Sequence, residues 1–156
     1  MKQIILFVAC IMMSLSCLSQ RVIVVEKSNV QSLLDAINKA NEQNADTTAE
    51  RLFILIPDGT YDLGETVLTR ISGHNIALIG ESMTGTVIQN KPDIKVESIS
   101  KTAVFQNRGT GNYFQDMTLK NALDYYATNE DGRAVTLQDK DDQIGRAVQQ
   151  ECRDRY

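Results

Sequence analysis

Three residues late in the chain are of types that hydrolytic chemistry can use. Arg133 lies close in sequence to Asp131 and Asp139. A carboxylate can act as a nucleophile or as a general acid and base, and an arginine stabilises the negative charge that develops during hydrolysis. A hydrolase site built from these three residues is therefore one hypothesis for function.

The other reactive side chains are better explained by structural roles. Gly80-Glu81-Ser82 begins like the turn that presents a nucleophilic serine, but Thr84 stands where that turn needs a glycine. His74, the single histidine, lies in a polar loop, and Cys152 has no base beside it. The acidic run 139–142 lacks the glycine and distal glutamate of a calcium loop. These motifs predict no catalytic residue, no metal site and no cofactor.

Composition limits the class of protein. The chain has 156 residues, of which 42% are hydrophobic and 23% charged, and its net charge is -4. These values are typical of a soluble globular domain, and the length allows one sizeable core. Because nucleic-acid backbones are bound by clustered lysine and arginine, the acidic balance argues against a nucleic-acid partner.

The N-terminus has the pattern of a secretory signal peptide over residues 1–19. Lys2 is followed by an apolar run from Ile4 to Met13, which is too short for the roughly 20 residues of a membrane-spanning helix. The sequence therefore predicts an exported protein, periplasmic or secreted, cleaved before Gln20, with no transmembrane segment. A lipoprotein anchored at Cys17 is the alternative.

Residues 20–50 are predicted to hold a strand and one helix. The strand is Arg21 to Val25, and Ser28 with Gln31 fits a capping box that starts the helix. Apolar residues then recur at helical spacing, in the order Val30, Leu33, Leu34, Ile37 and Ala40. This helix is expected to lie on an apolar surface.

Residues 51–142 read as short strands separated by turn residues. The predicted strands are Leu52–Ile56, Thr66–Leu68, Asn75–Ile79, Thr86–Ile88, Ala103–Phe105, Phe114–Leu119 and Arg133–Leu137. Two architectures fit this pattern, an antiparallel sandwich or barrel and a parallel β-helix. Two-residue hairpin turns are missing, which disfavours the first. For the second, Ile88, Val104, Leu119 and Val135 are interpreted as successive coils, and Asn90, Asn107 and Asn121 as a stack of corner residues.

Five segments in order resemble the opening half of pectinesterases. They are Phe53–Tyr61, Asn75–Glu81, Thr86–Ile88, Phe114–Asn121 and Arg133–Leu137. The resemblance implies a mainly β fold, a right-handed single-stranded parallel β-helix of the pectin-lyase type. It also implies a carbohydrate esterase that hydrolyses methyl esters of polygalacturonate, the cell-wall pectin. The helix from Asn29 would then cap the N-terminal end of the coils.

The same resemblance implies where chemistry would occur. The family uses two aspartates, an arginine and two glutamines that hold the oxyanion. The first glutamine falls at Arg133, which is the one substrate-binding residue carried over, and the aspartates have no counterpart. Gln138-Asp139 comes one coil too early for the acid/base pair. This chain alone is therefore expected to be inactive.

The C-terminal tail, residues 143–156, does not continue the family pattern. The expectation is a truncated β-helix whose open end exposes a strand edge and allows self-association. The alternative function is a non-catalytic secreted protein that binds carbohydrate on the β-helix face.

Overall fold

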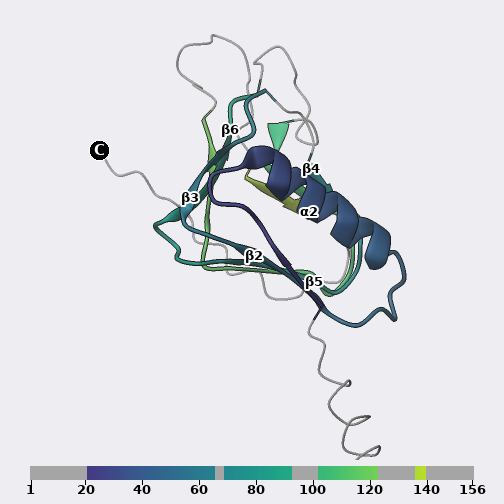
Figure 1. The fold of residues 1–156 in the computed structure, drawn as a ribbon. Coiled ribbons are helices and arrows are strands. Elements are labelled where there is room, and N and C mark those ends of the chain that lie inside the picture. The colour runs from purple at the N-terminus through teal and green to yellow at the C-terminus, as the bar shows by residue number, and fades with distance from the viewer. Residues whose placement is uncertain (1–20, 66–68, 93–101, 123–135, 140–156) are drawn as a thin grey trace, which may run out of the picture.

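In a computed structural model of the protein, residues 21–65, 69–92, 102–122 and 136–139 are described. They form one α-helix and ten short strands (Figure 1). The elements in chain order are β1 (Arg21–Val24), α2 (Val30–Gln43), β2 (Leu52–Ile56), β3 (Gly59–Asp62), β4 (Thr69–Ile71), β5 (Ile76–Gly80), β6 (Thr86–Asn90), β7 (Phe105–Asn107), β8 (Tyr113–Gln115), β9 (Thr118–Asn121) and β10 (Leu137–Asp139).

The strands belong to three parallel sheets that the chain visits in turn. Sheet A has the order β1-β2-β5-β8, sheet B has β3-β6-β9, and sheet C has β4-β7-β10. One coil is therefore β2-β3-β4, the next β5-β6-β7, and the third β8-β9-β10. All pairs are parallel, as in Tyr61 with Ile88 of sheet B and Ile88 with Leu119. This winding confirms the predicted parallel β-helix.

The predicted coil register is wrong. Ile88 and Leu119 are neighbours in sheet B, but Val104 leads into β7 of sheet C. The short steps in the sequence lead from sheet B to sheet C and back to sheet B, and each covers only part of a coil, because apolar residues recur on every sheet of a β-helix. Residue 135 lies outside the described residues.

The predicted asparagine stack is correct for two of its three members. Asn90 and Asn121 are paired in sheet B, and both side chains donate to the carbonyl of Thr102, at 3.0 and 2.8 Å. Asn107 lies in sheet C instead, where it donates to Asp139 at 3.2 Å.

Two strand predictions change in the structure. The segment expected as one strand from Phe114 to Leu119 is two strands on different sheets, because Asp116 turns the backbone with a φ of 53°. Gly59–Asp62, where no strand was predicted, is the sheet B strand β3. The predicted strand 66–68 lies outside the described residues, as do residues 133–135 of the last predicted strand.

The core fills the space between the three sheets. Ile54 and Leu78 project into it from sheet A, Tyr61 and Ile88 from sheet B, and Phe105 from sheet C, and each is at most 1% exposed. Burying a large apolar side chain stabilises the fold by about 1.5 to 3 kcal/mol. Inward residues alternate with outward ones, so each strand also presents side chains to the outer face of its sheet.

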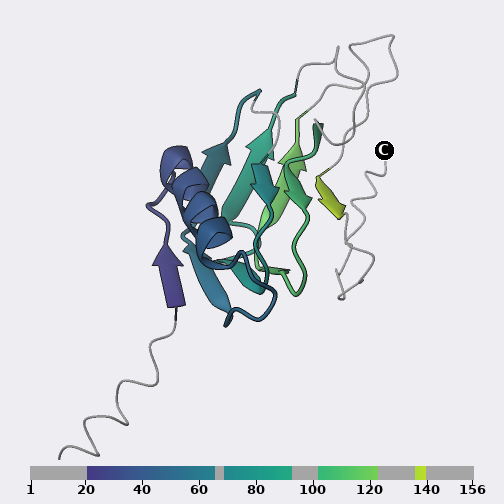
Figure 2. The same ribbon diagram turned by 90° about the vertical axis from the view of Figure 1, so that its right-hand side faces the viewer.

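The helix α2 closes one end of the coil stack. Its buried residues are Leu33, Ala36, Ile37 and Ala40, and it contacts all three strands of the first coil. Figure 2 shows α2 beside β1 at one end of the stack and β10 at the other. The helix therefore covers the core where a further coil would otherwise lie, as expected of a cap.

The start of α2 differs from the predicted capping box. The N-cap is Asn29, whose side chain accepts from the backbone N–H of Ser32 at 3.1 Å. Ser32 in turn accepts from the backbone N–H of Glu26 at 3.0 Å. Ser28 has a φ of 55° and lies one residue too early, and Gln31 donates to Asp35 instead. Asparagine competes well with serine as an N-cap, so the helix starts one residue later.

Two asparagines near the end of α2 hold the corner that follows β4. Asn41 donates to the carbonyl of Arg70 at 2.9 Å and accepts from the backbone N–H groups of Ser72 and Gly73, both at 3.0 Å. Asn44 donates to the carbonyl of His74 at 2.6 Å. The helix thereby fixes the end of the first sheet C strand.

Hydrogen bonds and burial shift the pKa values of Asp46, Tyr61 and Asp62. The backbone N–H of Thr48, with its hydroxyl, lowers the pKa of Asp46. Burial raises the pKa of the Tyr61 phenol. The backbone N–H of Gly64, followed by the side chain of Gln89, lowers the pKa of Asp62 from its usual 3.8.

The carboxylate of Asp62 should make the free energy of unfolding depend on pH in the acid range. Because its folded-state pKa lies below the unfolded value, it contributes stability above about pH 4 that is lost as the pH falls through the folded pKa. We expect Asp62→Asn to cost about a few tenths of a kcal/mol at pH 7, since the carboxylate is exposed and screened. The difference from the unsubstituted protein should vanish near pH 2. Urea unfolding at both pH values measures it, and an unchanged difference at low pH would contradict the assignment.

Candidate functional site

The outer face of sheet C presents a row of polar side chains. Thr69 and Phe105 point into the core, and Leu137 packs against it. The next residue of each strand lies on the opposite side of the sheet. These residues are paired in register across the three coils, and we call them the polar row: Arg70, Gln106 and Gln138.

Hydrogen bonds fix the centre of the polar row. Gln106 donates through Nε2 to Oε1 of Gln138 at 2.6 Å, and its own Oε1 accepts from Nε of Arg108 at 2.8 Å. Gln106 is 1% exposed, so its amide is oriented by these two partners rather than by solvent. Arg108 is anchored through its backbone N–H, which donates to the carbonyl of Ile71 at 2.8 Å.

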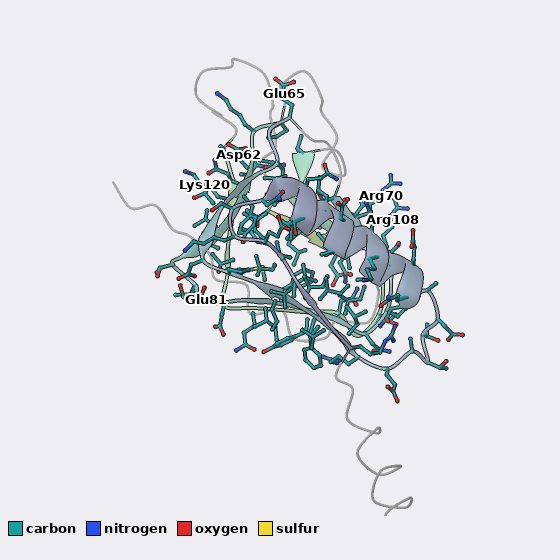
Figure 3. All side chains as sticks on the ribbon, in the orientation of Figure 1. Asp62, Glu65, Arg70, Glu81, Arg108 and Lys120 are labelled. Atoms are coloured by element: carbon teal, nitrogen blue, oxygen red, sulfur yellow. The ribbon has the colours of Figure 1, made fainter. Side chains whose placement is uncertain are left out.

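The two arginines carry unneutralised charge. Arg70 and Arg108 are exposed, and neither forms an ion pair with a carboxylate of the described part of the chain. Figure 3 shows both side chains on the right of α2, whereas Asp62 and Lys120 lie on the left. Guanidinium groups donate in a planar fork that matches a carboxylate. The outer face of sheet C can therefore bind an anionic ligand that has carboxylate groups.

Among the predicted site residues, only Asp139 is described by the structure. Its carboxylate accepts from the side-chain amide of Asn107, whose Oδ1 accepts from Nδ2 of Asn112 at 2.7 Å. Arg133 and Asp131 lie outside the described residues, so a site that combines them with Asp139 stays a prediction. Arg133 precedes β10 in sequence, and β10 carries Gln138 of the polar row.

The remaining reactive residues take part in corner hydrogen bonds. Nδ1 of His74 lies 2.9 Å from the hydroxyl of Thr110 and accepts from its backbone N–H at 3.0 Å. Ser82 donates to Asp58 at 2.8 Å and accepts from the backbone N–H of Gly85 at 3.0 Å, as in a turn. Within the described ranges, no three His, Cys, Asp or Glu side chains are grouped so that they could hold a metal ion.

Sequence reasoning missed Arg70, Gln106 and Arg108. A signal was available, because Thr69-Arg70-Ile71 and Phe105-Gln106-Asn107 each place a polar side chain between inward ones. That alternation becomes informative only when the two strands are known to be neighbours. Phe105 lies 34 positions after Ile71 in the sequence, and only the pairing of β4 with β7 in the structure brings the two strands together.

The outer face of sheet A is apolar and has a different character. A shallow pocket of about 380 Å³ lies there, lined by Leu55, Ile56, Pro57, Ile79, Gly80 and Glu81. Glu81 supplies the single titratable side chain of this lining, and it accepts from the backbone N–H of Asp58 at 2.9 Å. This pocket offers an apolar group a surface but gives no arrangement for catalysis.

No described helix is both long enough and apolar enough to cross a membrane. A comparison with curated proteins gives no match.

Solved structures of similar fold are pectin methylesterases. One is a variant enzyme in complex with a hexasaccharide, with 22% identity and a TM-score of 0.57 over 74% of this chain and 38% of that one. A second hexasaccharide complex has 25% identity and a TM-score of 0.56, with coverages of 74% and 38%. The pectin methylesterase PemA from Erwinia chrysanthemi has 23% identity and a TM-score of 0.56, with coverages of 76% and 38%.

The present chain thus spans 38% of the length of these three enzymes. Their structures share its fold of parallel coils. The family model described as Pectinesterase matches residues 21–153, which include the helix and all three coils. The chain belongs to the pectinesterase family.

Proposed function

We propose that the protein is a pectinesterase-like carbohydrate esterase whose polymer ligand, methyl-esterified polygalacturonate, lies along the outer face of sheet C. The observation that carries this proposal is the family match over residues 21–153 together with the polar row on that face. The units of a partly esterified polymer that are not esterified carry carboxylates, and Arg70 and Arg108 offer guanidinium donors to them.

We further propose that these 156 residues bind the polymer without cleaving it. Ester hydrolysis in the family needs a nucleophilic aspartate and a second one that carries the proton, and the sequence offers no counterpart of either. In the described part of sheet C, the polar row supplies donors but no pair of carboxylates. The role of Arg133 as a substrate-binding residue belongs to this proposal, since it precedes β10.

Methanol release and polymer binding test the proposal together. We expect no methanol above a buffer blank when the purified chain is incubated with highly esterified pectin, while an active pectinesterase in parallel releases it. We expect measurable retention of the chain by immobilised polygalacturonate. Methanol release would overturn the inactive assignment, and no retention by immobilised polygalacturonate would overturn the binding face.

A second candidate function is a non-catalytic secreted protein that binds carbohydrate. Arg70 and Arg108 favour it, because neither guanidinium forms an ion pair within the described residues, so both can bind an anion. Both candidates expect these residues to bind the polymer without releasing methanol, so the methanol assay separates them only from the active hydrolase built on Arg133, Asp131 and Asp139.

Export is part of the proposal. The division into a signal peptide over 1–19, a strand and capping helix over 20–50, coils over 51–142 and a divergent tail over 143–156 is proposed on the sequence pattern. Cell fractionation with mass analysis would separate cleavage before Gln20 from lipidation at Cys17. Self-association through the end of the coil stack is proposed too, and sedimentation velocity would detect it.

A further inference from the structure

We propose that Arg70 and Arg108 make the outer face of sheet C selective for de-esterified galacturonate over its methyl ester. This inference rests on the proposed function and names the form of the polymer that the face prefers. The two residues come from successive coils, at β4 and just after β7.

Both arginines are held in place at the backbone. The carbonyl of Arg70 accepts from Asn41 of α2 at 2.9 Å. The backbone N–H of Arg108 donates to Ile71 at 2.8 Å, and its Nε donates to the buried amide of Gln106 at 2.8 Å. Because Nε is already engaged, the terminal Nη groups of Arg108 are the donors that remain for a ligand. Less side-chain freedom of Arg108 is lost on binding from this restrained starting point.

The positive charges of Arg70 and Arg108 favour the binding of an anion. Neither guanidinium has a carboxylate partner in the described residues, although the chain as a whole has a net charge of -4. Two cations on neighbouring coils repel each other, and a bound carboxylate relieves that repulsion. A methyl ester is neutral, so it cannot form the charge-assisted hydrogen bonds that a free carboxylate forms with a guanidinium. The same face should therefore bind the esterified polymer more weakly.

A matched control exists on sheet B. Lys91 and Lys120 are exposed, and neither side chain forms an ion pair among the residues that the structure describes. Lys120 lies on β9, and Lys91 follows β6, whose end is paired with β9. Replacing both with glutamine removes the same net charge as replacing both arginines. A general effect of charge on polyanion binding would be equal for the two pairs.

The experiment compares dissociation constants of the full chain for polygalacturonate and for highly methyl-esterified pectin of matched length. The unsubstituted chain should bind polygalacturonate about ten-fold more tightly, as expected from charge-assisted against neutral hydrogen bonds. Arg70→Gln/Arg108→Gln should reduce this preference to about two-fold or less, and Lys91→Gln/Lys120→Gln should leave it near ten-fold. Added salt should weaken the binding of polygalacturonate more than that of pectin. Circular dichroism verifies that each variant is folded.

Arg70→Lys/Arg108→Lys keeps the charge without the planar fork, and it should retain part of the preference. Equal binding of the two polymers by the unsubstituted chain would overturn the selectivity but leave the proposed function standing. A preference that survives in the glutamine variant, or that falls equally in the lysine control, would also overturn it. Failure to bind either polymer would instead contradict the proposed function. If Arg70→Gln/Arg108→Gln does not fold, the selectivity is tested by the effect of salt on the unsubstituted chain, whose binding of polygalacturonate should weaken more than its binding of pectin.

Discussion

Phe105→Ala is expected to lower the free energy of unfolding by about 3 to 5 kcal/mol, the usual cost of emptying a buried phenylalanine site. Phe105 is fully buried at the start of β7, and its ring centroid lies 6.2 Å from that of Phe114, with 30° between the planes. The two rings join sheet C to sheet A within the core. The loss is a large fraction of the 5 to 15 kcal/mol that stabilises a typical domain.

The position of Phe105 also links the core to the polar row. Gln106 and Arg108 follow it directly, so a collapse of β7 should release both and abolish polygalacturonate binding. Chemical denaturation followed by circular dichroism measures the stability, with Met83→Ala as a control. Met83 is 51% exposed, and its substitution should change the free energy by about 0.5 kcal/mol or less. A loss below about 1 kcal/mol for Phe105→Ala would contradict the position of Phe105 in the core between sheets A and C.

The elements of this fold follow from local sequence, but their register does not. The apolar stripe of α2 and the β-branched run of β2 indicate their structures because both patterns repeat within a few residues. Coil register depends on corner lengths, and these vary: β2 and β3 are separated by two residues, whereas 14 residues lie between β6 and β7. Periodicity therefore cannot reveal that Tyr61, Ile88 and Leu119 are stacked.

The candidate site was harder to predict than the core for a related reason. An arginine on a surface strand is usually solvated, and nothing near Arg70 in the sequence distinguishes it. It becomes notable because the pairing of β4 with β7 places it beside Gln106, to which Arg108 is bonded. The sequence does not reveal that the segment divides into β8 and β9 at Asp116. A single residue with a left-handed backbone conformation produces no repeating pattern in the sequence.

Glycines at the corners test the coil stacking most directly. A Cβ added to Gly109 would lie 1.8 Å from the carbonyl oxygen of Gly73, at the equivalent corner of the preceding coil. The carbonyl oxygen belongs to the backbone, and the backbone also fixes the position of a Cβ, so the contact cannot be relieved by rotating a side chain. We expect Gly109→Ala to cost about 3 kcal/mol, the upper part of the range for overpacking. Because Arg108 is adjacent, the variant should also bind polygalacturonate less tightly.

Gly64 is the control for this experiment, because a side chain there would be disfavoured by the backbone conformation and not by crowding. It has a φ of 60°, and nothing lies within 4 Å of an added Cβ. Asparagine tolerates that backbone conformation, so Gly64→Asn should cost about 1 kcal/mol or less. Thermal and urea unfolding of both variants separate crowding between coils from backbone strain. If Gly109→Ala were as stable as Gly64→Asn, the corners of successive coils would have to lie farther apart than the parallel stacking places them, and the face that Arg70 and Arg108 share would be lost with it.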